Sequence, residues 1–239
     1  MKYIYRLIVA ALFVTVSATS FYSCETVEME LLASPNALSS DQADPDLLLN
    51  SIQLSYRGSQ RTFSNNSGDL GRISYMGGRQ YLDNYGDGTL NGAWNSFYSN
   101  NQPNLLALEQ ISEANPDRDL SYHLGVAKTL QAHTLMQLVD YLGDIPWSEA
   151  NNSTEFPKPS VDDDASVYDA AIAYLSEAAG HFASGAGIGT GTDFFYDGDA
   201  GKWSKLVKTL QMRANLTVGN YAAVASATGV IESTADDFQ

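Results

Sequence analysis

The chain has 239 residues, of which 28 are acidic and 13 are Lys or Arg, so its formal net charge is −15. This charge argues against nucleic acid or an anionic membrane surface as the main partner, because binding to either needs an excess of basic side chains. A single cysteine excludes an intramolecular disulfide framework and a Cys-rich zinc site, and a hydrophobic content of 44% is too high for a disordered chain.

The first segment, residues 1–23, has the pattern of a secretory signal peptide. Lys2 and Arg6 give it a basic start, and residues 7–16 form an apolar run. A membrane-spanning helix needs about 20 apolar residues, so this run is too short to cross a bilayer. The lone cysteine, Cys24, follows directly, which is typical of the lipid-bearing first residue of a bacterial lipoprotein. We therefore expect lipid attachment at Cys24.

The rest of the chain is predicted to form an acidic tether, residues 24–43, followed by a helical body, residues 44–239. Asp44 and Pro45 are typical of a helix start, where Asp caps and Pro occupies the first turn. Apolar residues spaced by three or four predict further helices over residues 91–114 (interrupted near Pro103), 119–142, 165–182 and 202–220.

Between these helices, three stretches rich in Gly, Asn, Asp or Pro predict long irregular loops at residues 63–92, 151–164 and 184–201. Alternating strand patterns are sparse. We expect a mostly α fold of antiparallel helix pairs, similar to tetratricopeptide units but without a clean fixed-period repeat.

Catalytic and metal-binding patterns are weak. His123, His133 and His181 do not have the spacing of metal ligands, and the chain contains neither a nucleophile elbow nor a phosphate-binding loop. Residues 197–199 (Asp-Gly-Asp) resemble part of a calcium loop but lack its third oxygen ligand and its trailing Glu. We therefore expect no cofactor, with calcium as a minor alternative.

Aromatic and polar side chains gather in residues 75–98. A flat ring offers an apolar platform for the C–H face of a sugar, and neighbouring Asn, Asp or Arg side chains bind its hydroxyls. The candidate ligand-binding residues are Tyr75, Arg79, Tyr81, Asn84, Tyr85, Trp94 and Tyr98. Trp94 and Tyr98 also have helical spacing, so a role in the core stays open for them.

Three segments carry a resemblance to a known family. Residues 141–150 (YLGDIPWSEA) are similar to the YGDIPYSEA segment of the SusD/RagB outer-membrane lipoproteins of Bacteroidota, in the branch with the GDIPWSEA form. Residues 34–36 and 43–50 resemble the start of that family. Residues 197–213 resemble its later element GD..KW.KF..SL..R.

The resemblance implies a lipoprotein of the outer membrane, exposed at the cell surface and without catalytic activity. Such a protein binds a nutrient, most often a glycan, and delivers it to a SusC-like TonB-dependent transporter. The scaffold residues that it implies are Gly143, Asp144, Pro146, Trp147 and Trp203. Family members are about twice this long, so we expect an N-terminal part of a SusD-like helical domain, with the C-terminal half missing.

Two alternatives belong to other classes of protein. A tetratricopeptide-like module would bind another protein through a concave helical face and would have no affinity for sugars. A secreted glycoside-active enzyme would need two carboxylates at a defined separation in a cleft, and the sequence does not single out such a pair.

Overall fold

The structure is a computed structural model that describes residues 2–4, 43–74, 86–184, 187–188 and 191–238. The chain divides into two units, Met1–Leu38 and Ser39–Gln239. Of the first unit only residues 2–4 are described, and they are helical. The remainder of the predicted signal peptide, Cys24 and the predicted tether up to residue 42 lie outside the described residues.

Helix α2 (Pro45–Leu70) begins where the sequence predicts. The Oδ1 atom of Asp44 accepts a hydrogen bond of 3.0 Å from the backbone N–H of Asp46, which caps the helix. The prediction of a loop from Phe63 onward is wrong, because the helix continues for two more turns. Phe63 is buried, and its ring stacks on Tyr141 of α6 at a centroid distance of 5.2 Å.

The predicted interruption near Pro103 takes the form of a π-helical turn. Helix α4 (Asn91–Ser96) leads into the turn η3 (Phe97–Asn101), and helix α5 (Gln102–Ala114) follows. Pro103 is the second residue of α5, and because it has no N–H it cannot donate a hydrogen bond back to the preceding turn, which coincides with the change of helical register. The side chains of Phe97 and Asn101 are buried, so the π-helical turn faces the core.

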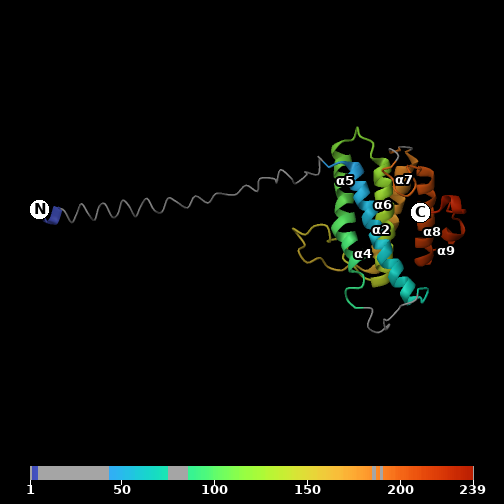
Figure 1. Ribbon diagram of the computed structural model, residues 1–239, viewed down its shortest axis with the longest axis horizontal. Helices are drawn as coiled ribbons and strands as arrows, with labels where there is room; N and C mark the ends of the chain where they lie inside the picture. The colour runs from blue at the N-terminus through green and yellow to red at the C-terminus, as the bar shows by residue number, and fades with distance from the viewer. Residues whose placement is uncertain (1, 5–42, 75–85, 185–186, 189–190, 239) are drawn as a thin grey trace. The chain divides into compact units, whose positions relative to one another are not determined.

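Helix α6 (Ser121–Leu142) lies at the centre of the second unit. It contacts α2, α5, α7 and α8, and Figure 1 shows it between α2 and α7. Consequently nearly every residue from Tyr122 to Val139 is buried, although this stretch includes polar side chains. The helix ends at Gly143, whose φ of +74° is a conformation that favours glycine.

Helix α7 (Asp164–Ala183) is antiparallel to α6. The hydroxyl of Tyr168 donates a hydrogen bond of 3.0 Å to Asp140 near the end of α6. At the other end of the pair, the rings of Phe182 and Tyr122 lie 5.6 Å apart. The two helices form the largest helix–helix contact in the unit.

The C-terminal helices pack beyond this pair. Helix α8 (Ala200–Thr217) contacts α7 and α6, and the short helix α9 (Tyr221–Ala225) packs on α8 (Figure 1). A single 3-10 turn, η4 (Thr234–Asp236), follows. Lys205 of α8 forms an ion pair with Asp236 at 2.7 Å, which fixes this turn to the helix.

A buried cation joins three helices. Lys128 of α6 is 6% exposed, and its Nζ lies 2.5 Å from carboxylate oxygens of Glu109 in α5 and Glu177 in α7. Burial alone would lower the pKa of Lys128, but the hydrogen bonds to the two carboxylates outweigh it and raise the pKa. The amine therefore stays charged and links α6 to both neighbours.

The prediction of a mostly α fold of antiparallel helix pairs is confirmed. The described residues contain no strand, and their one β-bridge joins Ile145 to Asp162. This bridge pins the connection between α6 and α7 at its two ends. Apart from this bridge, the connections at residues 151–163 and 191–199 contain turns but no helix or strand.

Candidate ligand-binding site

A hollow of about 390 Å³ lies where the ends of α2 and α6 meet the turn before α4. Its volume is in the range of small-molecule sites, about 300–1,000 Å³. The residues that line it are Asn66, Leu70, Gly86, Asp87, Thr89, Leu90, Tyr141 and Leu142. Because α2 and α6 are far apart in sequence, only their packing against each other assembles this hollow.

Its apolar wall is built by the ends of two helices. The ring of Tyr141 is held in place by stacking on Phe63 and by its hydroxyl, which donates to the Phe63 carbonyl oxygen at 3.2 Å and hydrogen bonds with Ser67. Leu70 and Leu142 are 52% and 45% exposed, so their methyl groups are available to a ligand. A fixed ring beside exposed aliphatic groups suits the C–H face of a sugar.

The polar groups of the hollow come mainly from the turn before α4. The hydroxyl of Thr89 donates to the Gly86 carbonyl oxygen at 2.8 Å, which stabilises the turn. The side-chain amide of Asn66 donates to the Thr89 carbonyl oxygen at 3.4 Å, which ties the turn to α2. The exposed carboxylate of Asp87 forms no ion pair with another described residue, so it is free to accept hydrogen bonds from hydroxyls.

Two of the predicted ligand-binding residues, Trp94 and Tyr98, are described, and neither lines the hollow. Both are partly buried, and their rings lie 4.5 Å apart. The hydroxyl of Tyr98 donates a 2.5 Å hydrogen bond to the Pro146 carbonyl oxygen, and burial raises the pKa of this hydroxyl. The pair thus connects α4 and η3 to the segment after α6.

The other five predicted ligand-binding residues lie outside the described residues. They are Tyr75, Arg79, Tyr81, Asn84 and Tyr85. The hollow begins at Gly86, the first described residue after them. Their role in ligand binding stays a prediction.

The segment after α6 is held by two carboxylates. Asp144 accepts a hydrogen bond of 3.1 Å from the backbone N–H of Asp164, at the start of α7. Asp162 accepts hydrogen bonds from the hydroxyl of Ser148 and from the backbone N–H groups of Trp147 and Ser148. The hydroxyl contributes most to lowering the pKa of Asp162, followed in the same direction by the backbone groups.

Trp147 lies between two helical layers. Its ring is 6.3 Å from Phe97 of η3 and 5.8 Å from Tyr174 of α7. With Gly143 ending α6 and Asp144 bonded to α7, the segment fixes how α6, α7 and η3 meet. The scaffold role that the sequence predicts for these residues stays a prediction.

A second set of contacts surrounds Asp193, which is 3% exposed. The indole N–H of Trp203 and the hydroxyl of Tyr122 each donate to its carboxylate at 2.8 Å. The backbone N–H groups of Phe195, Tyr196 and Gly198 donate to it as well. Trp203 is fully buried. Sequence reasoning missed Asp193, and the only signal was an acidic residue beside the aromatic run at 194–196.

The calcium-like segment is engaged in backbone contacts. Asp197 accepts from the backbone N–H of Gly191 at 3.2 Å, and Asp199 accepts from those of Gly201 and Lys202 and so caps α8. In the part of the chain that the structure describes, no three His, Cys, Asp or Glu side chains are grouped so that they could hold a metal ion. Whether the protein binds calcium stays untested.

The three histidines have separate environments. His123 pairs with Asp46 at 2.6 Å, and His133 accepts or donates a 2.7 Å hydrogen bond with the hydroxyl of Tyr56. Burial lowers the pKa of His133 to about 4, and burial also lowers that of His181. Nothing in these contacts brings the imidazoles together as a catalytic group.

Over the described ranges, every helix is either too short or too polar to cross a bilayer.

Comparison with models of protein families identifies the family of the chain. Residues 35–237 match a SusD-like family model described as starch-binding and associating with the outer membrane. The chain belongs to the SusD-like family. The resemblance inferred from the three sequence segments is therefore confirmed.

Solved structures agree with this assignment. A SusD/RagB family protein from Bacteroides thetaiotaomicron is 22% identical with a TM-score of 0.68. The alignment covers 82% of this chain and 44% of that protein. A SusD homologue from Bacteroides fragilis is 18% identical with a TM-score of 0.60, covering 82% and 43% of the two chains. These two likenesses show the fold.

A third structure is closer in sequence. A chitin-binding protein is 27% identical with a TM-score of 0.61. The alignment covers 82% of this chain and 45% of that protein. The chain thus spans less than half the length of these solved SusD-like proteins. Comparison with curated proteins gives no match.

Proposed function

We propose that this SusD-like protein is a lipoprotein of the cell surface that binds a glycan and delivers it to a SusC-like TonB-dependent transporter of the outer membrane. It catalyses no reaction of its own. The family description as starch-binding and associated with the outer membrane supports the ligand class and the location. The signal-peptide pattern before Cys24 supports the lipid anchor.

The observation that carries the proposal is the composition of the hollow at the ends of α2 and α6. A ring at Tyr141 and aliphatic groups at Leu70 and Leu142 face the same space as the carboxylate of Asp87. Sugars combine apolar C–H faces with hydroxyl donors, and they need both kinds of contact. A carboxylate that forms no ion pair with another described residue suits a neutral glycan.

Two glycans are the first to test. The starch-binding description of the family supports maltohexaose, an α-linked glucose oligomer. The likeness to a chitin-binding protein supports chitohexaose, whose N-acetyl methyl groups would contact the aliphatic wall at Leu70, Leu90 and Leu142. Binding of both is measured by isothermal titration calorimetry with the full chain in detergent.

Replacing Asp87 tests the location of the site. In Asp87→Asn the acceptor loses its charge, and hydrogen bonds to charged groups are worth about 1.5–3 kcal/mol. We therefore expect the dissociation constant of the bound glycan to rise about tenfold or more. Asp87 is exposed, so the fold is expected to remain intact, as circular dichroism would verify.

The matched control is Asp117→Asn, which removes the same charge from the exposed connection between α5 and α6. It is expected to bind the glycan as the unchanged protein does. Equal affinity of the Asp87 and Asp117 variants would contradict the site. Failure of the unchanged protein to bind either glycan would contradict the proposed ligands.

A further inference from the structure

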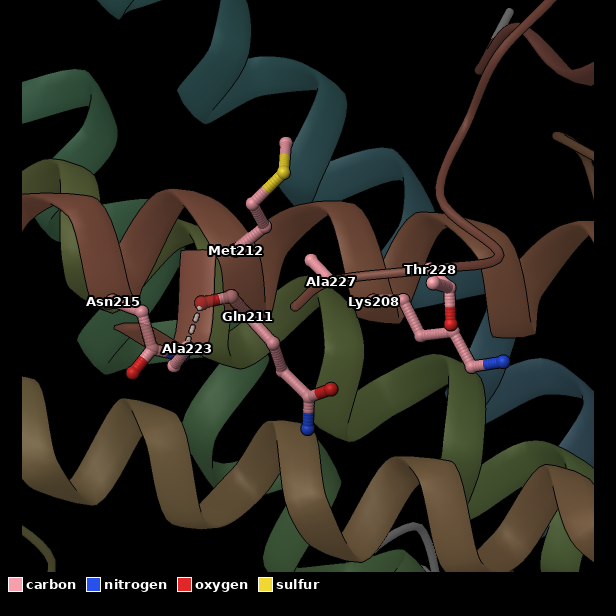
Figure 2. A pocket seen from close by; sticks show the side chains of 7 residues that line it. All are labelled: Lys208, Gln211, Met212, Asn215, Ala223, Ala227 and Thr228. Carbon is pink, nitrogen blue, oxygen red and sulfur yellow. Dashed lines mark hydrogen bonds between the residues drawn. The ribbon is translucent and has the colours of Figure 1, made fainter. Parts of the chain in front are cut away.

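A second hollow, of about 240 Å³, lies between α8 and the chain that follows α9 (Figure 2). It is separate from the hollow at the ends of α2 and α6 and shares no residue with it. The residues that line it are Lys208, Gln211, Met212, Asn215, Ala223, Ala227 and Thr228. It is smaller than the sites of drug-sized ligands, so it suits a ligand about the size of one sugar ring.

The cation of this hollow, Lys208, is exposed and forms no ion pair with another described residue. Of the other basic residues of α8, Lys202 also forms no ion pair with a described residue, whereas Lys205 and Arg213 do. Lys205 pairs with Asp236 at 2.7 Å, and Arg213 pairs with Asp140 at 3.4 Å. Of these four side chains only Lys208 lines the hollow, so its ammonium group is the positive charge that the described residues place there.

The backbone makes room for this ammonium group. Gly229 has a φ of +68°, and a Cβ atom at this position would lie 3.0 Å from Nζ of Lys208. Glycine therefore permits both the turn and the close approach of the amine. Figure 2 shows Lys208 beside Thr228, at the same end of the hollow.

Two neutral groups accompany the lysine. The side-chain amide of Gln211 and the hydroxyl of Thr228 form no hydrogen bond with another described residue. Asn215 differs, because its amide donates to the Gln211 carbonyl oxygen at 2.8 Å and its oxygen accepts from Asn220 at 2.9 Å (Figure 2 draws the first of these). Asn215 thus forms a fixed wall, and the other three groups remain to bind a ligand.

We propose that this hollow binds the carboxylate of an acidic sugar, with Lys208 as its charge partner and Gln211 and Thr228 as hydrogen-bond donors. Side chains of Met212, Ala223 and Ala227 line the same space and would contact the apolar face of the ring. A carboxylate carries one negative charge, whereas a phosphate monoester carries nearly two and is repelled more by an acidic protein. One lysine therefore matches the carboxylate better.

The test measures binding by isothermal titration calorimetry. The full chain, in detergent and at low salt, is titrated separately with sodium D-glucuronate, D-glucose and inorganic phosphate. A second arm uses an oligosaccharide that ends in glucuronate, which distinguishes a free sugar acid from the acidic end of a glycan. We expect glucuronate to bind and glucose to bind at least about tenfold more weakly, because glucose cannot accept a charge-assisted hydrogen bond from Lys208. Phosphate is expected to bind at least about tenfold more weakly as well, because its greater negative charge is repelled by the acidic protein and it has no ring to contact the apolar wall.

Variants locate the binding. In Lys208→Ala and in Gln211→Glu, which places a carboxylate in the hollow, the dissociation constant for glucuronate is expected to rise about tenfold or more. Lys158→Ala removes an equal charge from the exposed loop between α6 and α7 and is expected to bind glucuronate normally. Asp87→Asn is also expected to bind it normally, which separates this site from the proposed glycan site.

Three results would overturn the inference. These are no binding of glucuronate by the unchanged chain, equal affinity for glucose and glucuronate, and equal loss of affinity in the Lys208 and Lys158 variants. All three variants alter exposed or partly exposed side chains, so a folded protein, checked by circular dichroism, is expected in each case.

Discussion

At the scale of single residues, buried polar groups decide how the helices meet. Asp193 is the clearest example, because the loop before α8 wraps its backbone N–H groups around one carboxylate that also binds Trp203 of α8 and Tyr122 of α6. Five donors compensate for the burial of this charge. From the sequence, Asp193 looks like any acidic loop residue, because the two side chains that donate to it are ten and 71 positions away.

His133 allows a prediction about pH at the same scale. Burial lowers its pKa from 6.5 to about 4 in the folded protein. Between these pH values the unfolded chain binds a proton that the folded chain does not, so the free energy of unfolding falls as the pH falls from 6.5 to 4. The loss attributable to His133 is up to about 3 kcal/mol.

Urea denaturation of the unchanged protein and of His133→Gln, at pH 7 and pH 4.5, measures this effect. The variant is expected to lose less stability on acidification than the unchanged protein, because glutamine does not titrate. An NMR titration gives a direct check, since the imidazole of His133 should take up its proton near pH 4. Titration near pH 6.5 would contradict the buried, neutral state.

At the scale of helices, the sequence predicts the helix ends that depend on local capping better than those that depend on packing. Asp44 and Pro45 mark the start of α2, and Gly143 marks the end of α6, because capping depends on local chemistry. The end of α2 was missed, since the Ser-Asn-Asn-Ser run at 64–67 has weak helix propensity. Packing of Phe63 on Tyr141 and the hydrogen bond of Ser67 with Tyr141 keep that run helical.

Two glycines test the difference between a helix end and a helix interior. Gly143 has φ of +74° and ψ of −125°, and a Cβ there would contact nothing within 4 Å. Gly143→Ala is therefore expected to destabilise the protein through the backbone alone, by about 1–3 kcal/mol. Gly180 lies inside α7 and also has open space around it, so Gly180→Ala is expected to stabilise the protein by about 0.5–1 kcal/mol.

Thermal and urea denaturation of both variants gives the comparison. The substitution adds the same methyl group in each case, so opposite signs isolate the backbone conformation as the cause. A Gly143 variant as stable as the unchanged protein would show that the end of α6 adapts to an ordinary residue.

At the scale of the whole molecule, the candidate site shows how far sequence reasoning extends. The sequence predicts that residues 75–98 bind the ligand, and four residues of this stretch, Gly86, Asp87, Thr89 and Leu90, line the hollow. Half of the wall, however, comes from Asn66 and Leu70 of α2 and from Tyr141 and Leu142 of α6. Their proximity to the turn at residues 86–90 depends on long-range packing, which no local pattern in the sequence reveals.

The lipid anchor gives a prediction for the whole protein in the cell. Cys24 follows an apolar run and is the only cysteine, so Cys24→Ala is expected to abolish lipid attachment. The proposed glycan site lies in the helical body and is distant in sequence from Cys24, so the variant is expected to keep its affinity for glycan while losing the proposed membrane location. The proposed delivery to a transporter requires both, and the change separates them.

The measurement combines cell fractionation, mass spectrometry of the mature chain and protease treatment of intact cells. The unchanged protein is expected in the outer-membrane fraction, with acyl chains on Cys24 and with its helical body open to added protease. The Cys24→Ala protein is expected in a soluble fraction and should not be recovered together with a TonB-dependent transporter. A Cys24→Ser variant, which keeps the size of the side chain but not the thiol, should behave in the same way. If either variant stayed in the outer membrane with its mass increased by acyl chains, the assignment of Cys24 as the anchor would be wrong.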